Sequence, residues 1–185
     1  DLGFKAVGGI LNGPILLPMA IAGAGIVISV IGTMLVTIKD NKAKEDKVMA
    51  ALNKGNITSI ILVAVSSYIL TLYMLPSKMM MKFFGETQPV EVSSMDVFYA
   101  TIVGLIVGAL ISSVTEYYTG LGKKPILKIV QQSSTGAATN IISGLATGMI
   151  STFPSVLLFA AAIWSSYEFA GFYGVAMSAS AMMAT

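Results

Sequence analysis

Residues 95–148 read MDVFYATIVGLIVGALISSVTEYYTGLGKKPILKIVQQSSTGAATNIISGLATG. The stretch contains two apolar segments, and each carries two glycines four residues apart, Gly104 with Gly108 and Gly144 with Gly148. Glycines at this spacing lie on one face of a helix and let two membrane helices approach closely. The pattern predicts two membrane-spanning helices that pack against their neighbours through these four glycines.

A short basic loop joins the two segments. Residues 120–128 contain three lysines and no acid, and a polar cluster lies on either side, TEYYT at 115–119 and GAATN at 136–140. Polar and ionisable groups close to the hydrocarbon are costly, so they are candidates for a functional role. The two clusters are therefore the first place to look for a site.

The composition is that of a membrane protein. Hydrophobic residues make up 55% of the 185 residues and charged residues 11%, whereas soluble domains carry roughly 25% charged residues. The mean hydropathy is +0.82. The absence of cysteine and histidine excludes disulfides, thiolate nucleophiles, imidazole bases and the usual zinc sites. A net charge of +2 is too small to suggest nucleic acid as a partner.

The uncharged runs predict an all-α fold, a polytopic transmembrane bundle with about four complete spans and a truncated fifth. Glycines, prolines and charges set the expected ends of the helices. A bend is expected at Pro154, because proline removes a backbone donor inside the fourth run. The chain begins at Asp1 and stops inside an uncharged run, so we expect an internal part of a longer polypeptide. The predicted spans of this single domain, residues 1–185, are 15–38, 56–77, 95–119, 137–164 and 169–185.

The lysines predict how the bundle is oriented. Eight of the eleven lysines lie in the loops 39–54 and 120–128, whereas Lys5, Lys78 and Lys82 belong to the opposite side. Cytoplasmic loops carry an excess of lysine and arginine. We therefore expect a multi-pass integral membrane protein whose loops 39–54 and 120–128, with both polar clusters, face the cytoplasm.

Glu116 is the acid attached to the end of the third span. It is a candidate for function, but it also suits an interfacial carboxylate that binds a tyrosine hydroxyl or pairs with Lys123 or Lys124, and the sequence favours this second interpretation. Tyr117, Thr139 and Asn140 are further helix-end residues for which we predict a structural or coupling role.

Asn140 also begins a polar stripe along one face of its helix. The stripe could line an ion path or pack against a neighbouring helix, and packing is favoured. Its other members follow at helical spacing: Gly144, Thr147, Gly148 and Ser151.

The linker 78–96 contains two local signals. Its KMMMKFF segment, residues 78–84, is too short to cross a bilayer and is expected at the membrane surface. Ser93 and Asp96 have the spacing of a capping box, which predicts a helix start there. No nucleotide-binding loop, paired acids or metal-ligand spacing is present, so the sequence offers no catalytic residue and no metal ligand.

Three segments together resemble a known family. VTEYYT at 114–119, TGAATNIISGLATG at 135–148 and AGFYGVAMSASAMMAT at 170–185 are similar to the middle of the membrane-integral pyrophosphatases, the pyrophosphate-energised sodium and proton pumps. The resemblance implies a larger fold of roughly sixteen transmembrane helices in a homodimer of the bacterial inner membrane. It covers nearly the whole chain.

The resemblance also implies an activity. The full-length protein would hydrolyse pyrophosphate with Mg²⁺, in some members with K⁺, and pump Na⁺ or H⁺ outward, Na⁺ being favoured on overall similarity. The aspartates that bind magnesium pyrophosphate in the family lie outside this segment, so the segment alone is expected to be inactive. Its helices would mainly form a scaffold around the catalytic funnel, in contact with membrane lipid and with the rest of the chain.

Two other functions stay open from the residues alone. A secondary transporter or channel segment is the main alternative, because transporters use helices interrupted by glycine and proline, as at 8–18 and at Pro154. A structural subunit of a membrane assembly is the third. Aspartate-rich cytoplasmic motifs in the complete reading frame would distinguish the pump from both.

Overall fold

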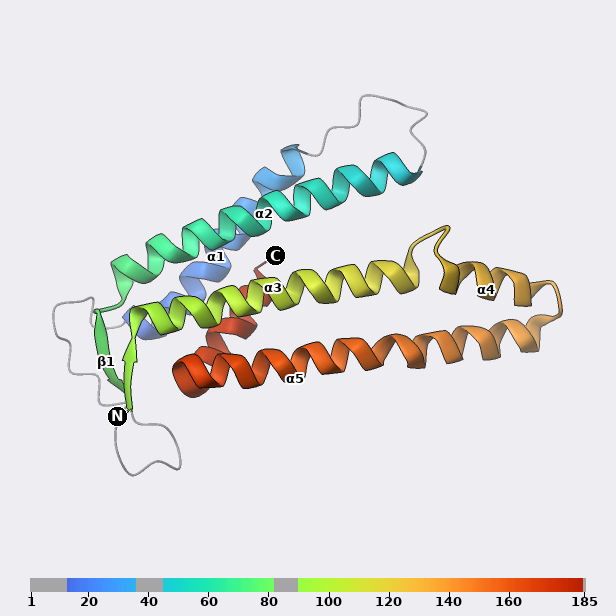
Figure 1. The fold of residues 1–185 in the computed structure, drawn as a ribbon. Coiled ribbons are helices and arrows are strands. Elements are labelled where there is room, and N and C mark those ends of the chain that lie inside the picture. The colour runs from blue at the N-terminus through green and yellow to red at the C-terminus, as the bar shows by residue number, and fades with distance from the viewer. Residues whose placement is uncertain (1–12, 36–44, 82–89, 185) are drawn as a thin grey trace. The chain divides into compact units, whose positions relative to one another are not determined.

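The computed structural model describes residues 13–35, 45–81 and 90–184. Within these residues four helices are long and apolar enough to cross a membrane, namely α1, α2, α3 and α5, which confirms the predicted all-α transmembrane fold (Figure 1). The elements in chain order are α1 (Gly13–Leu35), α2 (Glu45–Met74), β1 (Lys78–Met81), β2 (Val90–Ser93), α3 (Ser94–Thr119), α4 (Lys124–Ser133) and α5 (Ala137–Met183).

The chain divides into two compact units. The first consists of residues 1–108 and 162–185, and the second of residues 109–161. The helices α3 and α5 each contribute one part to each unit.

In the first unit α1 and α2 pack side by side in opposite directions. Gly13 lies against the backbone carbonyl of Met74, and Gly32 lies against the side chain of Ser59. The start of one helix therefore meets the end of the other. Large apolar side chains fill the space between the close contacts, and Leu17, Ile21 and Val63 are almost completely buried.

The helix α5 breaks inside the first unit. Ala170 (φ −143°, ψ 26°) and Gly171 (φ 57°, ψ −148°) leave the helical region, and the angles of Gly171 are open only to a residue without a Cβ. The interruption expected between the spans 137–164 and 169–185 lies at Ala170 and Gly171, just inside the second of these spans. The backbone stays helical through Pro154, and the bend expected there stays a prediction.

The part of α5 after this break, residues 172–183, is called the return segment. Going along it, Gly174, Ser178 and Met182 meet Ala100, Gly104 and Gly108 of α3 in the same order, so the two helices run parallel. The end of the chain that includes the return segment also runs parallel to α1. The Tyr173 hydroxyl donates a hydrogen bond to the Pro14 carbonyl (2.8 Å), and Gly25 lies against Ala184.

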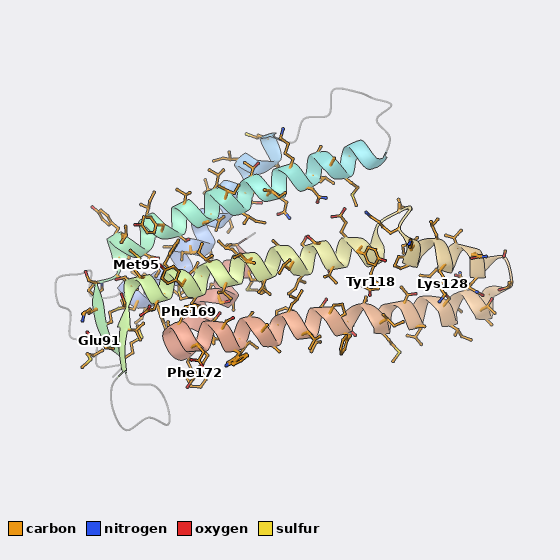
Figure 2. The ribbon with its side chains drawn as sticks, viewed as in Figure 1. Glu91, Met95, Tyr118, Lys128, Phe169 and Phe172 are labelled. Carbon is orange, nitrogen blue, oxygen red and sulfur yellow. The ribbon has the colours of Figure 1, made fainter. Side chains whose placement is uncertain are left out.

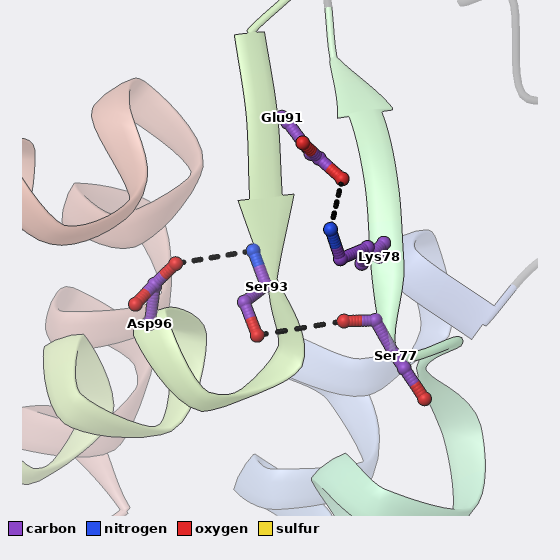
Figure 3. A network of polar contacts seen from close by, with 5 residues as sticks. All are labelled: Ser77, Lys78, Glu91, Ser93 and Asp96. Atoms are coloured by element: carbon purple, nitrogen blue, oxygen red, sulfur yellow. Dashed lines mark hydrogen bonds and ion pairs between the residues drawn. The ribbon is translucent and has the colours of Figure 1, made fainter.

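A β-hairpin occupies part of the predicted linker 78–96. β1 and β2 pair antiparallel, with Met79 opposite Val92, and both of these side chains are buried. On the exposed face Lys78 Nζ lies 2.8 Å from Glu91 Oε1 (Figure 3). This hydrogen bond and the negative charge of Glu91 raise the pKa of the Lys78 ammonium group. Because both side chains are exposed, the pair contributes little to stability.

The predicted cap at the start of α3 is present, and the Ser93 hydroxyl oxygen accepts the Met95 backbone N–H (3.4 Å). The Ser93 backbone N–H donates to Asp96 Oδ2 (3.1 Å), and the Ser93 hydroxyl donates to the Ser77 carbonyl (3.4 Å), as Figure 3 shows. The Ser94 hydroxyl donates to the Pro76 carbonyl (2.8 Å). These bonds connect the start of α3 to the end of α2.

Two predicted loops are partly helical. The loop predicted at 39–54 is helical from Glu45 onward, and residues 36–44 lie outside the described part. The basic loop predicted at 120–128 becomes helix α4 at Lys124. In both places the lysines mark where the chain leaves the apolar region, whereas the helices extend into the charged stretch.

Candidate functional site: the polar turns of the second unit

The TEYYT cluster forms the last turns of α3. The hydroxyls of Thr115 and Thr119 donate to the carbonyls of Ile111 and Thr115, each at 2.8 Å. The rings of Tyr117 and Tyr118 meet edge to face with centroids 5.2 Å apart. Both threonine hydroxyls therefore bind carbonyl oxygens of their own helix.

Glu116 is half-exposed, and its backbone carbonyl accepts the Gly120 N–H (2.7 Å). Gly120 is buried in the turn that follows, where a Cβ would lie 2.7 Å from the Glu116 carbonyl oxygen. Gly122 adopts φ 74°, and the Lys123 N–H closes the turn by donating to the Gly120 carbonyl (3.2 Å). The turn needs small residues, which fixes where the chain leaves α3.

The helix α4 is amphipathic. It begins with Lys123 as its N-cap residue and with Pro125 in its first turn, where proline needs no hydrogen-bond partner for its nitrogen. At 100° per residue, one face carries Ile126, Leu127, Ile129 and Val130, and the other carries Lys124, Lys128, Gln131 and Gln132. In Figure 2 Tyr118 marks the end of α3 and Lys128 lies in α4.

Thr139 is the centre of the turn between α4 and α5. Its Oγ1 lies 2.7 Å from the Thr135 hydroxyl, 3.1 Å from the Gln132 carbonyl and 2.8 Å from the Gly136 carbonyl. The Thr135 hydroxyl also reaches the Gln132 carbonyl (2.7 Å). Two hydroxyls thus satisfy backbone carbonyls that the end of α4 leaves free.

Asn140 takes part in the same turn through its backbone. Its N–H donates to the Gly136 carbonyl (3.2 Å), and Gly136 has φ 139°. The Asn140 Oδ1 atom is buried and has no hydrogen-bond partner among the residues that the structure describes.

A groove of about 300 Å³ lies between α4 and the first turns of α5. Its α4 side is formed by Lys128 and Gln132, and its α5 side follows a single stripe along the helix. The residues of that stripe are Thr139, Ile142, Ser143, Ala146, Thr147 and Ile150. Sequence reasoning missed the groove, although the alternation of apolar and polar residues through 124–133 was a signal for a second, amphipathic helix.

The two predicted glycine pairs lie in different surroundings. Gly104 faces the Ser178 backbone, and a Cβ on Gly108 would lie 3.2 Å from Met182 Cγ. A Cβ on Gly144 or Gly148 would meet nothing within 4 Å. The structure thus packs Gly104 and Gly108 against the return segment. For Gly144 and Gly148, packing against a neighbouring helix stays a prediction for the complete protein.

The described residues contain no group of three or more Asp, Glu, His or Cys side chains that could hold a metal ion. A complete carboxylate site for Mg²⁺ is therefore not formed by the described residues alone. That other parts of the protein bind Mg²⁺ remains a prediction.

Comparison with known proteins gives consistent matches. The family model described as inorganic H⁺ pyrophosphatase matches residues 4–185. The chain is 34% identical over 178 residues to pyrophosphate-energized proton pump 2 of Rhizobium leguminosarum bv. trifolii, which covers 94% of this chain and 77% of that protein. It is 34% identical over 166 residues to pyrophosphate-energized proton pump 2 of Mycoplana dimorpha, covering 90% of this chain and 76% of that protein.

A third relative is much longer than this chain. The K(+)-insensitive pyrophosphate-energized proton pump of Methanosarcina mazei is 33% identical over 185 residues, which is 96% of this chain and 24% of that protein. The predicted resemblance is thereby confirmed. From these matches and its transmembrane helices, this chain belongs to the family of inorganic H⁺ pyrophosphatases, integral membrane enzymes that hydrolyse pyrophosphate and pump ions.

Proposed function

We propose that the protein containing this chain couples hydrolysis of pyrophosphate to the outward pumping of protons. The observation that carries the proposal is the family match over residues 4–185. The three relatives are named proton pumps, which favours H⁺ over the Na⁺ that overall similarity first suggested. The loops 39–54 and 120–128 would then face the cytoplasm, where pyrophosphate is bound.

We further propose that this segment is mainly scaffold within a homodimeric pump. Its contribution would be mechanical, because close contacts between small residues hold α3, α1 and the return segment together at Gly104, Gly25 and Gly174. Small residues at such contacts are the usual way in which membrane helices pack without a hydrophobic driving force. Mg²⁺, and K⁺ if it is required, would be bound by parts of the protein outside the described residues.

A hydrolysis assay tests the activity. Phosphate release from pyrophosphate is measured on membranes with the full-length protein, with and without Mg²⁺, K⁺ and Na⁺. The proposal expects Mg²⁺-dependent release that Na⁺ leaves unchanged. Release that requires Na⁺ would move the proposal to a sodium pump, and no release from folded protein under any of these salts would refute it.

The cytoplasmic ends of α3 and α5 have a proposed role of their own. Glu116 and Asn140 would hold these ends against the inner helices of the pump, with Tyr117 and Thr139 supporting the turns. The buried Asn140 Oδ1, which has no partner among the described residues, fits an acceptor for a donor on such a helix. Variants Glu116→Ala and Asn140→Ala should lower the thermal stability of the full-length protein, and unchanged stability together with unchanged hydrolysis would contradict this role.

A further inference from the structure

The groove between α4 and α5 changes from polar to apolar along its length. Gln132 lies at the turn, where its carbonyl is 3.1 Å from Thr139 Oγ1, and Lys128 lies one turn earlier in α4. From Thr139 to Ile150 the α5 wall extends for about 16 Å, at 1.5 Å per residue. Its far end is lined by Ala146 and Ile150.

The threonine hydroxyl deeper in the groove is already bonded within its own helix. The Thr147 Oγ1 atom donates to the Ser143 carbonyl (2.9 Å), a bond that hides the hydroxyl from an apolar neighbour. The polar chemistry of the groove is therefore concentrated near Lys128, Gln132 and Thr139. An amphipathic occupant, with a polar head and an apolar tail, matches this gradient.

The charge of this region selects an anionic head. Between Glu116 and Glu168 the sequence contains no acid, whereas Lys123, Lys124 and Lys128 all lie within six residues. Clusters of lysines beside a membrane span attract anionic lipid headgroups.

The position of α4 points to a membrane surface. Its ten residues extend for about 15 Å, half of the roughly 30 Å needed to cross the hydrocarbon. The polar residues Lys128 and Gln132 line the groove, while Leu127 and Val130 on the apolar face are 53% and 61% exposed. Because α4 is too short to cross the bilayer and carries lysines, we place it and its groove near the membrane surface.

We propose that the groove between α4 and α5 binds one anionic phospholipid of the cytoplasmic leaflet. The headgroup phosphate binds Lys128 and Gln132, and an acyl chain lies along Ile142, Ala146 and Ile150. This lipid would fix the angle between α4 and α5 and so the position of the turn at Thr139. The inference concerns this chain's own residues and does not depend on the proposed pumping.

A lipid titration followed by native mass spectrometry tests the proposal. Purified full-length protein is delipidated in mild detergent, titrated with phosphatidylglycerol and examined by native mass spectrometry. We expect one lipid per protomer that binds more tightly than the rest, and phosphatidylcholine should bind that site at least about tenfold more weakly. In the variant Lys128→Gln the tight site should weaken by about tenfold, which corresponds to about 1.4 kcal/mol. Equal binding by Lys128→Gln and the unchanged protein would overturn the proposal.

Matched control variants test whether tight lipid binding requires the groove itself, or only a surface lysine or an exposed apolar position. Lys54→Gln removes an exposed lysine of α2 and should leave the tight site unchanged. Ala146→Trp fills the groove and should abolish tight binding although every lysine remains. Leu145→Trp changes the neighbouring position, which is 66% exposed, and should leave tight binding intact. Loss of binding in both tryptophan variants, or in neither, would contradict the assignment of the groove.

A photo-crosslinker placed at Ser143 identifies the occupant directly. A covalent lipid adduct in native membranes supports the proposal. An adduct to another peptide of the same protein would show that a helix fills the groove and would overturn it. Inorganic phosphate at millimolar concentration should not displace the lipid, because the acyl chain supplies part of the affinity; full displacement would make the site a phosphate site instead.

Discussion

At Gly104 the backbone of α3 comes so close to the return segment that an added methyl group would reach the Ser178 carbonyl oxygen. Gly25 and Gly174 make comparable approaches to Ala184 and Ser166. In a membrane, where apolar side chains gain little by leaving lipid, such close contacts supply much of the attraction between helices. At the scale of single residues, the helix packing of the first unit depends on the absence of a side chain at these glycines.

The variant Gly104→Val tests this dependence. A valine at this position would push α3 away from the return segment, and overpacking of this kind costs about 1–3 kcal/mol. The midpoint of thermal unfolding of the full-length protein should fall clearly. The matched change Gly144→Val adds the same side chain where a Cβ meets nothing within 4 Å and should shift stability by less than about 0.5 kcal/mol. An equal loss in both variants would show that Gly144 is packed in the complete protein.

Thr139 offers a second test at the residue scale. The variant Thr139→Val keeps the shape but removes the hydroxyl that binds Thr135, Gln132 and Gly136. Loss of such a hydrogen bond costs about 1 kcal/mol. Amide exchange in residues 133–140, followed by mass spectrometry, should become faster, and Thr139→Ser should restore the slower rate. If valine and serine behave alike, the hydroxyl is not what holds the turn.

At the scale of elements, the sequence predicted the helices better than their ends. The spans around α1, α2 and α3 follow from uncharged runs of sufficient length. The start of α2 at Glu45 could not be predicted from the uncharged run, because a lysine marks the edge of the membrane and not the end of a helix. The residues EDKVMAALNK are mostly good helix formers, so the helix continues past the apolar region.

The hairpin and α4 were missed for different reasons. β1 and β2 have four residues each, too few for a period-two pattern to stand out, and the methionines of KMMM have no strong strand preference. The helix α4 does have a clear amphipathic pattern, but three lysines and a proline within six residues suggested a loop. The groove could not be predicted without knowing that Lys128 and Thr139 lie on facing helices.

Gly171 tests the largest change of direction in α5. With φ 57° and ψ −148°, any side chain at this position would be strained by about 1–3 kcal/mol. Gly171→Ala should lower the thermal midpoint of the full-length protein and reduce the folded fraction in gel filtration. Gly148→Ala, in a regular part of the helix, serves as the control and should be neutral or slightly stabilising, because alanine favours a helix. Stability unchanged by Gly171→Ala would mean that the break is not required.

At the scale of the whole molecule, a transmembrane helical segment of 185 residues belongs to a family of ion-pumping pyrophosphatases. Composition and hydropathy established the membrane and the all-α class. The residues alone left a transporter open, and the resemblance at 114–119, 135–148 and 170–185 led to the pump. The described residues provide no carboxylate cluster for Mg²⁺, and that the catalytic aspartates lie outside this segment stays a prediction.

The most direct measurement uses inside-out membrane vesicles from cells that express the full-length protein. Pyrophosphate and Mg²⁺ are added, and a pH-sensitive dye reports the lumen while radioactive Na⁺ is counted in parallel. The account predicts acidification of the lumen that a protonophore collapses and that proceeds without added Na⁺. Hydrolysis of pyrophosphate with no accumulation of either ion, by protein that is folded and correctly inserted, would contradict it.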